Sequence, residues 1–360
     1  MMKRITFCAL LMTLFLLLSC GSGSAKTEDP KTTFLTSIAN LGKGFLDVFT
    51  SLSDMITGAF GIKADTKKSD IGQYFTDIET TMNTVKKKLQ TEVANNGNYS
   101  KVKSVVDHFI TNTLDKIAEG AKKAASGATT DAAIGEVVKS DAGTSVDATS
   151  VNALVKGIKT IIDVFLKDGD GQADKTDPVA NDKRDIGKLF GGKNSDANGG
   201  AEDKHVAAAS ASIGAVTGAD ILKAIASANA DATKDGAVKD ATDVAALALA
   251  KGTSTDNDDQ LGDSARKDAV IAAGIALRAM AKDGKFIVKD TAAKKTEAEA
   301  AKGAAASAVG KTLSTLIIAI RNTVDSGLKT ISEALAAVKQ EDKSVEVTNT
   351  VEATASGQQQ

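Results

Sequence analysis

Apolar residues recur at alternating steps of four and three near both ends of the chain. The two seams consist of Phe34, Ile38, Leu41, Phe45, Val48, Leu52 and Met55, and of Leu316, Ile317, Ile320, Val324, Leu328, Ile331, Leu335 and Val338. A seam with this period runs along one side of an α-helix and needs a partner helix to cover it. We therefore predict two long helices, over residues 31–60 and 315–338, that pair with each other.

Further segments show the same helical period. They cover residues 71–93, 102–125, 151–166, 206–228, 244–250 and 267–281. The sequence has only two prolines, and alanine is abundant, which favours helix over strand. We predict an all-α fold, an elongated helical bundle whose long N- and C-terminal helices are paired.

The first nineteen residues have the layout of a secretory signal peptide. Lys3 and Arg4 precede an apolar run over residues 5–18, which is shorter than the roughly 20 residues of a membrane-spanning helix. The run ends in Leu-Leu-Ser-Cys, which resembles a bacterial lipobox cut before the cysteine. This resemblance implies a lipid on Cys20. Cys8, the only other cysteine, would be removed with the signal peptide, so no disulfide is expected.

We expect four successive regions in the chain. Residues 1–19 are the lipoprotein signal peptide, 20–30 a flexible tether, 31–345 a single helical domain and 346–360 a disordered tail. Two long polar segments, residues 167–204 and 251–262, interrupt the helices, the first broken only by a short apolar stretch at 186–190. With both chain ends near the lipid, these loops would be distal to the membrane and free to change without unfolding the body.

Two short sequences resemble phosphate-binding loops without completing the motif. Residues 187–194 match Gly-x4-Gly-Lys, but Asn194 stands where Ser or Thr is needed to hold magnesium. Residues 305–312 end in Gly-Lys-Thr but begin with Ala305 in place of glycine. Neither follows a strand pattern. We interpret the first as a surface turn and the second as the start of the C-terminal helix.

The candidate metal ligands also depart from known patterns. Residues 168–179 resemble an EF-hand calcium loop, but Ala173 replaces the glycine of the sharp turn and Val179 replaces the bidentate glutamate. The two histidines, His108 and His205, lack the partners and spacing of a zinc site, and we expect a structural role for His108. We predict no metal, no cofactor and no catalytic residue.

The charge pattern argues against a nucleic-acid-binding protein. The formal net charge is −2 and no basic stripe is evident, so nucleic acid is not an expected partner. The sequence also shows no recognisable nucleophile elbow for Ser/His/Asp chemistry. It therefore favours a protein that is not an enzyme and that contacts a membrane through its lipid.

Three internal stretches resemble a known family. Residues 268–286 read DAVIAAGIALRAMAKDGKF, residues 191–194 read GGKN and residues 213–225 read IGAVTGADILKAI. With the lipobox and the long terminal helices, they resemble the variable large proteins of relapsing-fever Borrelia. More distantly, they resemble the Vls variable surface antigen of Lyme-disease Borrelia. The Met-Ala-Lys-Asp-Gly-x-Phe sequence at residues 280–286 is the most specific part.

The resemblance implies an outer-surface lipoprotein antigen that undergoes antigenic variation, with one variant expressed at a time, for evasion of the host immune response. It implies a lipid anchor in the outer membrane through Cys20, with the protein facing the cell exterior. Host antibodies are the expected partners, and a homodimer remains open.

Two other classes of protein could share these sequence features: a surface adhesin and a lipid-anchored enzyme. A surface adhesin or receptor for a host ligand is the alternative, and an exposed apolar or basic patch would favour it. A lipid-anchored enzyme would need a concave pocket with convergent carboxylates. The sequence shows no pattern for such a patch or pocket, and we therefore prefer the antigen.

Overall fold

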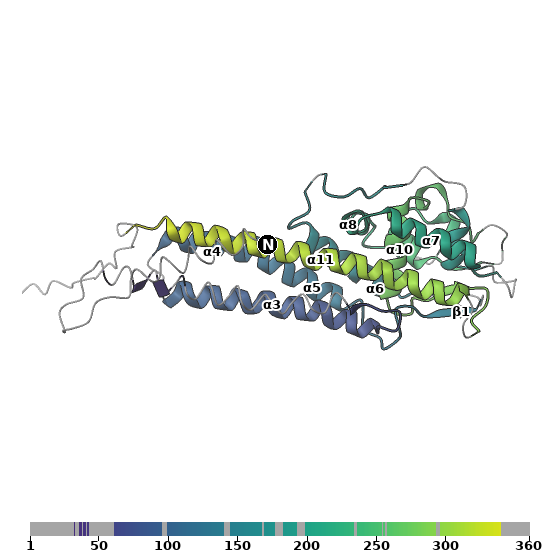
Figure 1. Ribbon diagram of the computed structural model, residues 1–360, viewed down its shortest axis with the longest axis horizontal. Coiled ribbons are helices and arrows are strands. Elements are labelled where there is room, and N and C mark those ends of the chain that lie inside the picture. Colours follow the sequence, from purple (N-terminus) through teal and green to yellow (C-terminus); the bar gives the residue numbers. More distant parts are fainter. Residues whose placement is uncertain are drawn as a thin grey trace, which may run out of the picture. The chain divides into compact units, whose positions relative to one another are not determined.

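The computed structural model describes most of the chain beyond residue 60. The described residues are 61–95, 99–139, 145–167, 169–176, 183–192, 199–233, 236–253, 255, 258–292 and 296–339, with six further helical positions between residues 32 and 42. The signal peptide, the tether, most of the predicted helix over 31–60 and the tail over 346–360 lie outside them. The described part is predominantly helical, as predicted, with two short strands (Figure 1).

The chain falls into two compact units. The terminal unit comprises Lys88–Asp107 and Leu328–Gln360 together with Met1–Val48, and the body comprises Phe49–Lys87 and His108–Gly327. Helices α3 (Lys68–Asn95), α4 (Ser100–Phe109) and α11 (Thr296–Ala336) contribute residues to both units.

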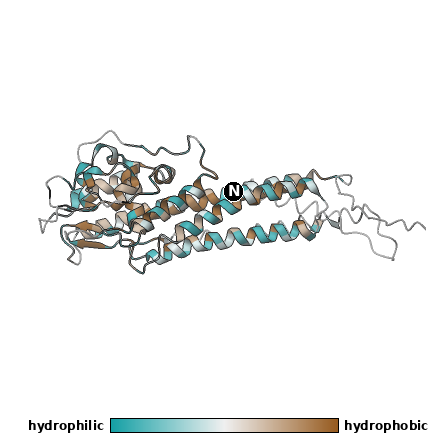
Figure 2. Ribbon diagram, turned by 180° about the vertical axis from the view of Figure 1, so that it is seen from behind, coloured by the Kyte–Doolittle hydropathy of each residue, from teal (hydrophilic) through white to brown (hydrophobic). Residues whose placement is uncertain are grey.

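The apolar faces predicted for the two long described helices are buried. On α3 they are Ile71, Phe75, Ile78, Met82, Val85, Leu89 and Val93, and on α11 they are Leu316, Ile317, Ile320, Val324, Leu328, Ile331 and Leu335. Figure 2 shows the corresponding apolar and polar stripes along both helices. The last seam residue, Val338, lies beyond the end of α11 and is only half-buried. The spacing of apolar residues therefore identified the buried faces of both helices correctly, although α11 begins at Thr296, 19 residues before the predicted start at residue 315.

The predicted helix over residues 102–125 contains a π-helical turn. Between α4 and α5 (Asp115–Ala125), residues Ile110–Leu114 form η2, a π-helix. A π-turn adds one residue to the helical repeat and shifts the buried face by one position. Consequently Leu114 is buried where a regular helix would have placed Thr113, which is only half-buried.

Helices α5 and α6 (Ala148–Ile162) pack against each other at two glycines. A Cβ on Gly120 would lie 2.7 Å from the carbonyl oxygen of Gly157, so the two backbones are in direct contact. Asp147 caps α6 by accepting a hydrogen bond from the Ser150 N–H at 2.7 Å. The helix ends at Ile162, four residues before the predicted end.

The predicted helix over residues 206–228 is two helices. They are α7 (Asp203–Ala215) and α8 (Gly218–Ala226), which meet at 98°. Thr217 and Asp220 form a capping box that starts α8, and this local signal overrides the continuous apolar pattern.

Helix α10 (Asp268–Met280) lies at the centre of the body. All of its residues are buried, and it contacts α6, α7, α8 and the short α9 (Val244–Leu249) (Figure 1). Apart from Asp268 and Arg278 its residues are apolar or glycine, and a helix that is apolar on nearly all sides is covered on all sides. Three 3-10 turns complete this region: η3 (Arg184–Leu189), η4 (Val238–Asp240) and η5 (Asp263–Ala265).

Two strands that the sequence did not predict form a small parallel sheet. β1 (Val137–Lys139) pairs with β2 (Phe286–Val288), with Val137 opposite Phe286. Each strand has only three residues, too few to produce a recognisable alternation of apolar and polar residues. The short apolar stretch within the predicted polar loop also joins the core, because Ile186, Leu189 and Phe190 are buried.

One described helix, α11, is long and apolar enough by itself to cross a membrane. The bent pair α7 and α8 passes the same test only if counted as one segment. Half of the most apolar part of α11 is buried within the protein.

Candidate functional site

The predicted lipidation site, Cys20, lies outside the described residues. Its role remains a prediction from the lipobox. Within the described residues, the candidate sites are the family stretch, the two histidines, the look-alike motifs and two surface grooves.

The most specific family stretch, residues 268–286, is a buried structural element. It comprises α10, a turn and the start of β2, and all the residues of both regular elements are buried. Asp283 in the turn has a φ of 62°, and Gly284 packs so closely on the Arg278 carbonyl that a Cβ would overlap it. Glycine is thus required at position 284, and Asp283 adopts a left-handed conformation that few residues other than glycine, asparagine and aspartate tolerate.

The side chain of Lys68 holds this turn from the start of α3. It is fully buried, and its ammonium donates hydrogen bonds to the carbonyl oxygens of Ala279 and, at 3.0 Å, of Gly284. Burial lowers the pKa of Lys68 to about 7, a shift opposed by the carboxylate of Glu136 and reinforced by the nearby Arg278 charge.

Arg278 links the same turn to the rest of the body. Its guanidinium donates to the carbonyl oxygens of Lys285 at 2.6 Å, Ala248 at 3.0 Å and Ala250 at 2.6 Å. It also lies 5.8 Å from the centre of the Phe190 ring, within range of a cation–π interaction. Burial lowers the pKa of Arg278 to about 9. Both buried cations serve to satisfy backbone carbonyls, which is a structural role.

The two histidines have different surroundings. His108 is exposed on α4. His205 is buried at the start of α7, where Nδ1 accepts the Glu202 N–H at 3.0 Å and Nε2 lies 3.7 Å from a carboxylate oxygen of Asp185. Burial lowers the pKa of His205, as does the charge of Lys188, while Asp185 opposes this shift. His205 is thus a helix cap that the sequence did not reveal.

The residues of the two phosphate-loop look-alikes also have structural roles. Lys311 lies within α11 and donates to the carbonyl oxygens of Ile213 and Val216, both at 2.7 Å, at the end of α7. Gly187 lies in η3, packed against the backbone of Asp259. The described part of its motif, residues 187–192, therefore begins within η3 and packs on the body, whereas a surface turn was predicted.

The EF-hand look-alike is fixed to α8. Asp220 accepts the Gln172 N–H at 2.7 Å, and the Asp170 carboxylate accepts the Lys167 N–H at 3.0 Å. Across the described residues, no three His, Cys, Asp or Glu side chains gather in an arrangement that could hold a metal ion.

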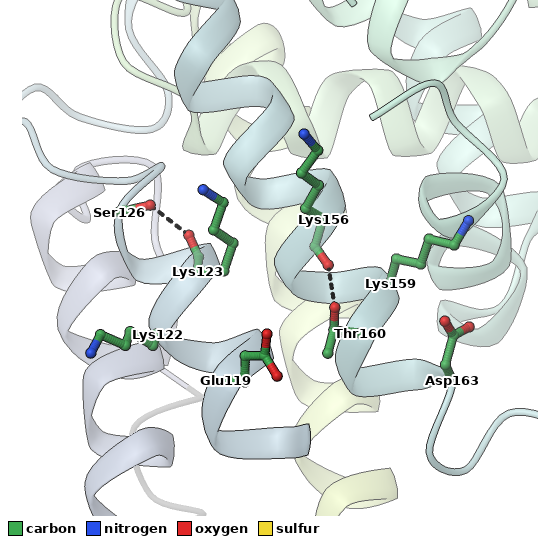
Figure 3. Close-up of a pocket in the computed structure, with 8 residues that line it drawn as sticks. All are labelled: Glu119, Lys122, Lys123, Ser126, Lys156, Lys159, Thr160 and Asp163. Carbon is green, nitrogen blue, oxygen red and sulfur yellow. Dashed lines mark hydrogen bonds between the residues drawn. The ribbon is translucent and has the colours of Figure 1, made fainter. Parts of the chain in front are cut away.

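An open groove of about 610 Å³ is lined by residues of α5 and α6 and their ends (Figure 3). All eight lining residues are polar: Glu119, Lys122, Lys123, Ser126, Lys156, Lys159, Thr160 and Asp163. In Figure 3, Lys123 and Lys156 extend toward one end, whereas the carboxylates of Glu119 and Asp163 lie toward the other. This arrangement can bind charged groups. A smaller groove of about 470 Å³, which includes the Lys289–Glu202 ion pair, has mixed charge.

Comparisons with known proteins agree with the fold. A model of the Borrelia lipoprotein family matches residues 45–335. The chain is 60% identical to Variable large protein 4 of Borrelia hermsii over 99% of this chain and 100% of that protein, and 61% identical to Variable large protein 17 over 100% and 99%. The crystal structure of the Lyme disease variable surface antigen VlsE of Borrelia burgdorferi superposes with a TM-score of 0.69 at 36% identity, covering 84% of this chain and 99% of VlsE.

The fold, with its buried family stretch, is thus that of a helical bacterial surface antigen. The chain belongs to the Borrelia lipoprotein family and, within it, to the variable large proteins. The predicted all-α class and the family resemblance are both confirmed, whereas the pairing of the N- and C-terminal helices stays a prediction, because most of residues 31–60 lie outside the described part.

Proposed function

We propose that the protein is an outer-surface lipoprotein antigen that undergoes antigenic variation, with one variant expressed at a time, for evasion of the host immune response. The lipid on Cys20 anchors it in the outer membrane, facing the cell exterior, and host antibodies are its partners. We propose no catalytic role.

One observation carries the proposal: α10 and the start of β2, which make up most of the most specific family stretch, are buried inside the body. Lys68, Arg278 and Gly284 fix an internal framework that antibodies do not reach on the folded protein. Substitutions of exposed residues that do not contact this framework change the free energy of unfolding by only about 0.5 kcal/mol. The exposed surface can therefore vary while the framework is kept, which is what serial replacement of an antigen requires.

The expressed gene can be sequenced from successive relapses of one infection started by a single cell. We expect substitutions to concentrate at exposed positions and to spare α10, β2 and Lys68. An unchanged sequence through several antibody-resistant relapses would argue against antigenic variation by this protein.

The anchor can be tested separately. In Cys20→Ser, detergent-phase partitioning and membrane association should be lost, whereas Cys8→Ser, in the predicted signal peptide, should preserve both. Protease treatment of intact cells should remove the wild-type protein if it faces the exterior. Continued detergent partitioning of Cys20→Ser would contradict lipidation at this residue.

A further inference from the structure

We propose that His205 is an acid-sensitive switch: in its neutral form it holds the segment over residues 200–202 against β2, and its protonation releases this segment. The inference goes beyond the antigen function and does not depend on it. It begins with the hydrogen bond at the start of α7, where Nδ1 of His205 accepts the N–H of Glu202 at 3.0 Å. A ring nitrogen that accepts a hydrogen bond carries no proton, so this contact requires the neutral imidazole.

The segment over residues 200–202 lies along β2 and leads directly into α7. Ala201 forms a parallel bridge with Val288, and its carbonyl oxygen accepts the Lys289 N–H at 2.9 Å. A Cβ on Gly200 would lie 2.4 Å from the carbonyl carbon of Val288, so the two backbones are in direct contact. Gly200 and Ala201 are both buried. The hydrogen bond to His205 fixes the end of this segment where the helix begins.

The other ring nitrogen of His205 has no hydrogen-bond partner among the described residues. Nε2 is buried, and a carboxylate oxygen of Asp185 on η3 lies 3.7 Å away, beyond hydrogen-bond distance. Protonation would place a second N–H at Nδ1, directly opposite the Glu202 N–H, and two donors cannot share a hydrogen bond. The protonated ring would gain an acceptor by moving toward Asp185, and this movement breaks the bond that holds the segment.

The charges nearest to His205 favour the neutral ring in balance. Burial is the largest cause that lowers the pKa of His205 below its ordinary 6.5, and the charges of Lys188 and Lys204 act in the same direction, while Asp185 and Glu202 oppose them. The positive end of the α7 helix dipole also disfavours a cation in the first turn. Protonation, and with it the release of the segment, is therefore expected in mild acid.

The remaining charged groups that face the start of α7 are engaged or of mixed sign. On α10, which packs on α7, Asp268 pairs with Lys183 at 2.9 Å and Arg278 binds backbone carbonyls. Lys289, which follows β2, pairs with the Glu202 carboxylate at 2.9 Å. The small groove beside this pair is also lined by Lys139, Asp203, Asp290 and Glu297.

The test compares hydrogen exchange of the full-length lipidated protein in detergent micelles at about pH 7.5 and pH 5.0, corrected for the intrinsic exchange rate at each pH. Peptides containing residues 200–206 report the segment and the start of α7. The informative variant is His205→Gln, because a glutamine at this helix position can accept the Glu202 N–H through its side-chain oxygen but does not titrate. The matched control is His108→Gln, which removes the exposed histidine on α4 and leaves His205 in place.

We expect the wild type and His108→Gln to lose protection over residues 200–206 by about fivefold at the lower pH, the effect of losing one helix cap. His205→Gln should keep its protection at both pH values. His205→Ala, which cannot accept the N–H at any pH, should show the loss already at pH 7.5. Lys68 also gains a proton over this range, so variants are compared at the same pH to separate the local change from a general loss of stability.

A second measurement follows the imidazole itself. In the protein with isotope-labelled histidine, NMR should show the His205 ring neutral at pH 7.5 with its proton on Nε2, and its protonation should coincide with the loss of protection. The same pH-dependent loss in His205→Gln would assign the change to another group and overturn the proposal. Equal protection of the wild type at both pH values, or a proton on Nδ1 at pH 7.5, would also overturn it.

Discussion

The ammonium nitrogen of Lys68 lies 3.0 Å from the carbonyl oxygen of Gly284, 216 residues later in the chain. This hydrogen bond ties the start of α3 to the turn between α10 and β2. Lys68 is fully buried, so each carbonyl that it satisfies would otherwise lack a donor.

Replacing Lys68 should destabilise the body. Lys68→Met fills a similar volume but leaves the carbonyls of Ala279 and Gly284 without their donor, and we expect a loss of about 2 kcal/mol in the free energy of unfolding. Chemical denaturation followed by circular dichroism measures the change. Lys63→Met, at an exposed lysine, should alter stability by less than about 0.5 kcal/mol. Equal effects of the two changes would contradict the role of Lys68.

Lys68 should also make stability depend on pH. Its pKa is lowered from 10.5 to about 7 in the folded protein, so the unfolded chain binds the extra proton between these values. Stability contributed by this group is therefore lowest below pH 7 and rises with pH toward 10.5. The free energy of unfolding of the wild type minus that of Lys68→Met should increase between pH 7.5 and 9, by up to about 1 kcal/mol per pH unit. A flat difference would show that the pKa is not lowered.

The buried ion pair between Lys183 and Asp268 permits a second test. The two charged atoms lie 2.9 Å apart, and the side chains are 10% and 1% exposed. Asp268→Asn removes the carboxylate from a nearly buried ammonium, and we expect a loss of about 3 kcal/mol. The apolar double variant Lys183→Met with Asp268→Leu should recover most of this loss. If Lys183→Met with Asp268→Leu is less stable than Asp268→Asn, the ion pair itself is strongly stabilising.

Two glycine substitutions should act in opposite directions. Gly157→Ala would bring a Cβ to 2.5 Å from the Gly120 carbonyl oxygen, and separating α5 from α6 should cost about 2 kcal/mol. Gly303 lies in the exposed part of α11 with no atom within 4 Å of an added Cβ. Gly303→Ala should therefore stabilise the protein by about 0.5–1 kcal/mol through higher helix propensity. Thermal unfolding of both variants measures the signs.

Acid should weaken the corner between α7 and α8 through Asp220. Burial alone would raise the pKa of Asp220, but the N–H groups of Thr217 and Gln172 outweigh burial and lower it. A lowered carboxyl pKa contributes stability above the unfolded value of 3.8, which is lost as pH falls through the folded value. Asp220→Asn should be less stable by about 1 kcal/mol at neutral pH, and this difference should shrink in acid. Urea denaturation across the acid range tests this.

The burial of Lys68 and Arg278 could not be predicted from the sequence. Lysine and arginine are rarely buried, so Lys68 reads as an ordinary exposed start of a helix. Arg278 gave a weak signal, since it and Asp268 are the only charged residues in α10. The groove lysines are visible as Lys122-Lys123 and as Lys156 with Lys159. Their shared position, however, depends on the contact between Gly120 and Gly157.

The sequence by itself determined the family, the helical class, the presence of a helix at α10 and the buried faces of α3 and α11, because helix periodicity and apolar burial are local or nearly local effects. The lipidation of Cys20 also rests on the sequence alone. Only the tertiary structure decided the π-turn at Ile110–Leu114, the pairing of β1 with β2, and the burial of Lys68 and Arg278. The strand pairing and the two buried cations depend on groups far apart in the chain, because a carbonyl that lacks a donor in its own segment must find one wherever folding brings it.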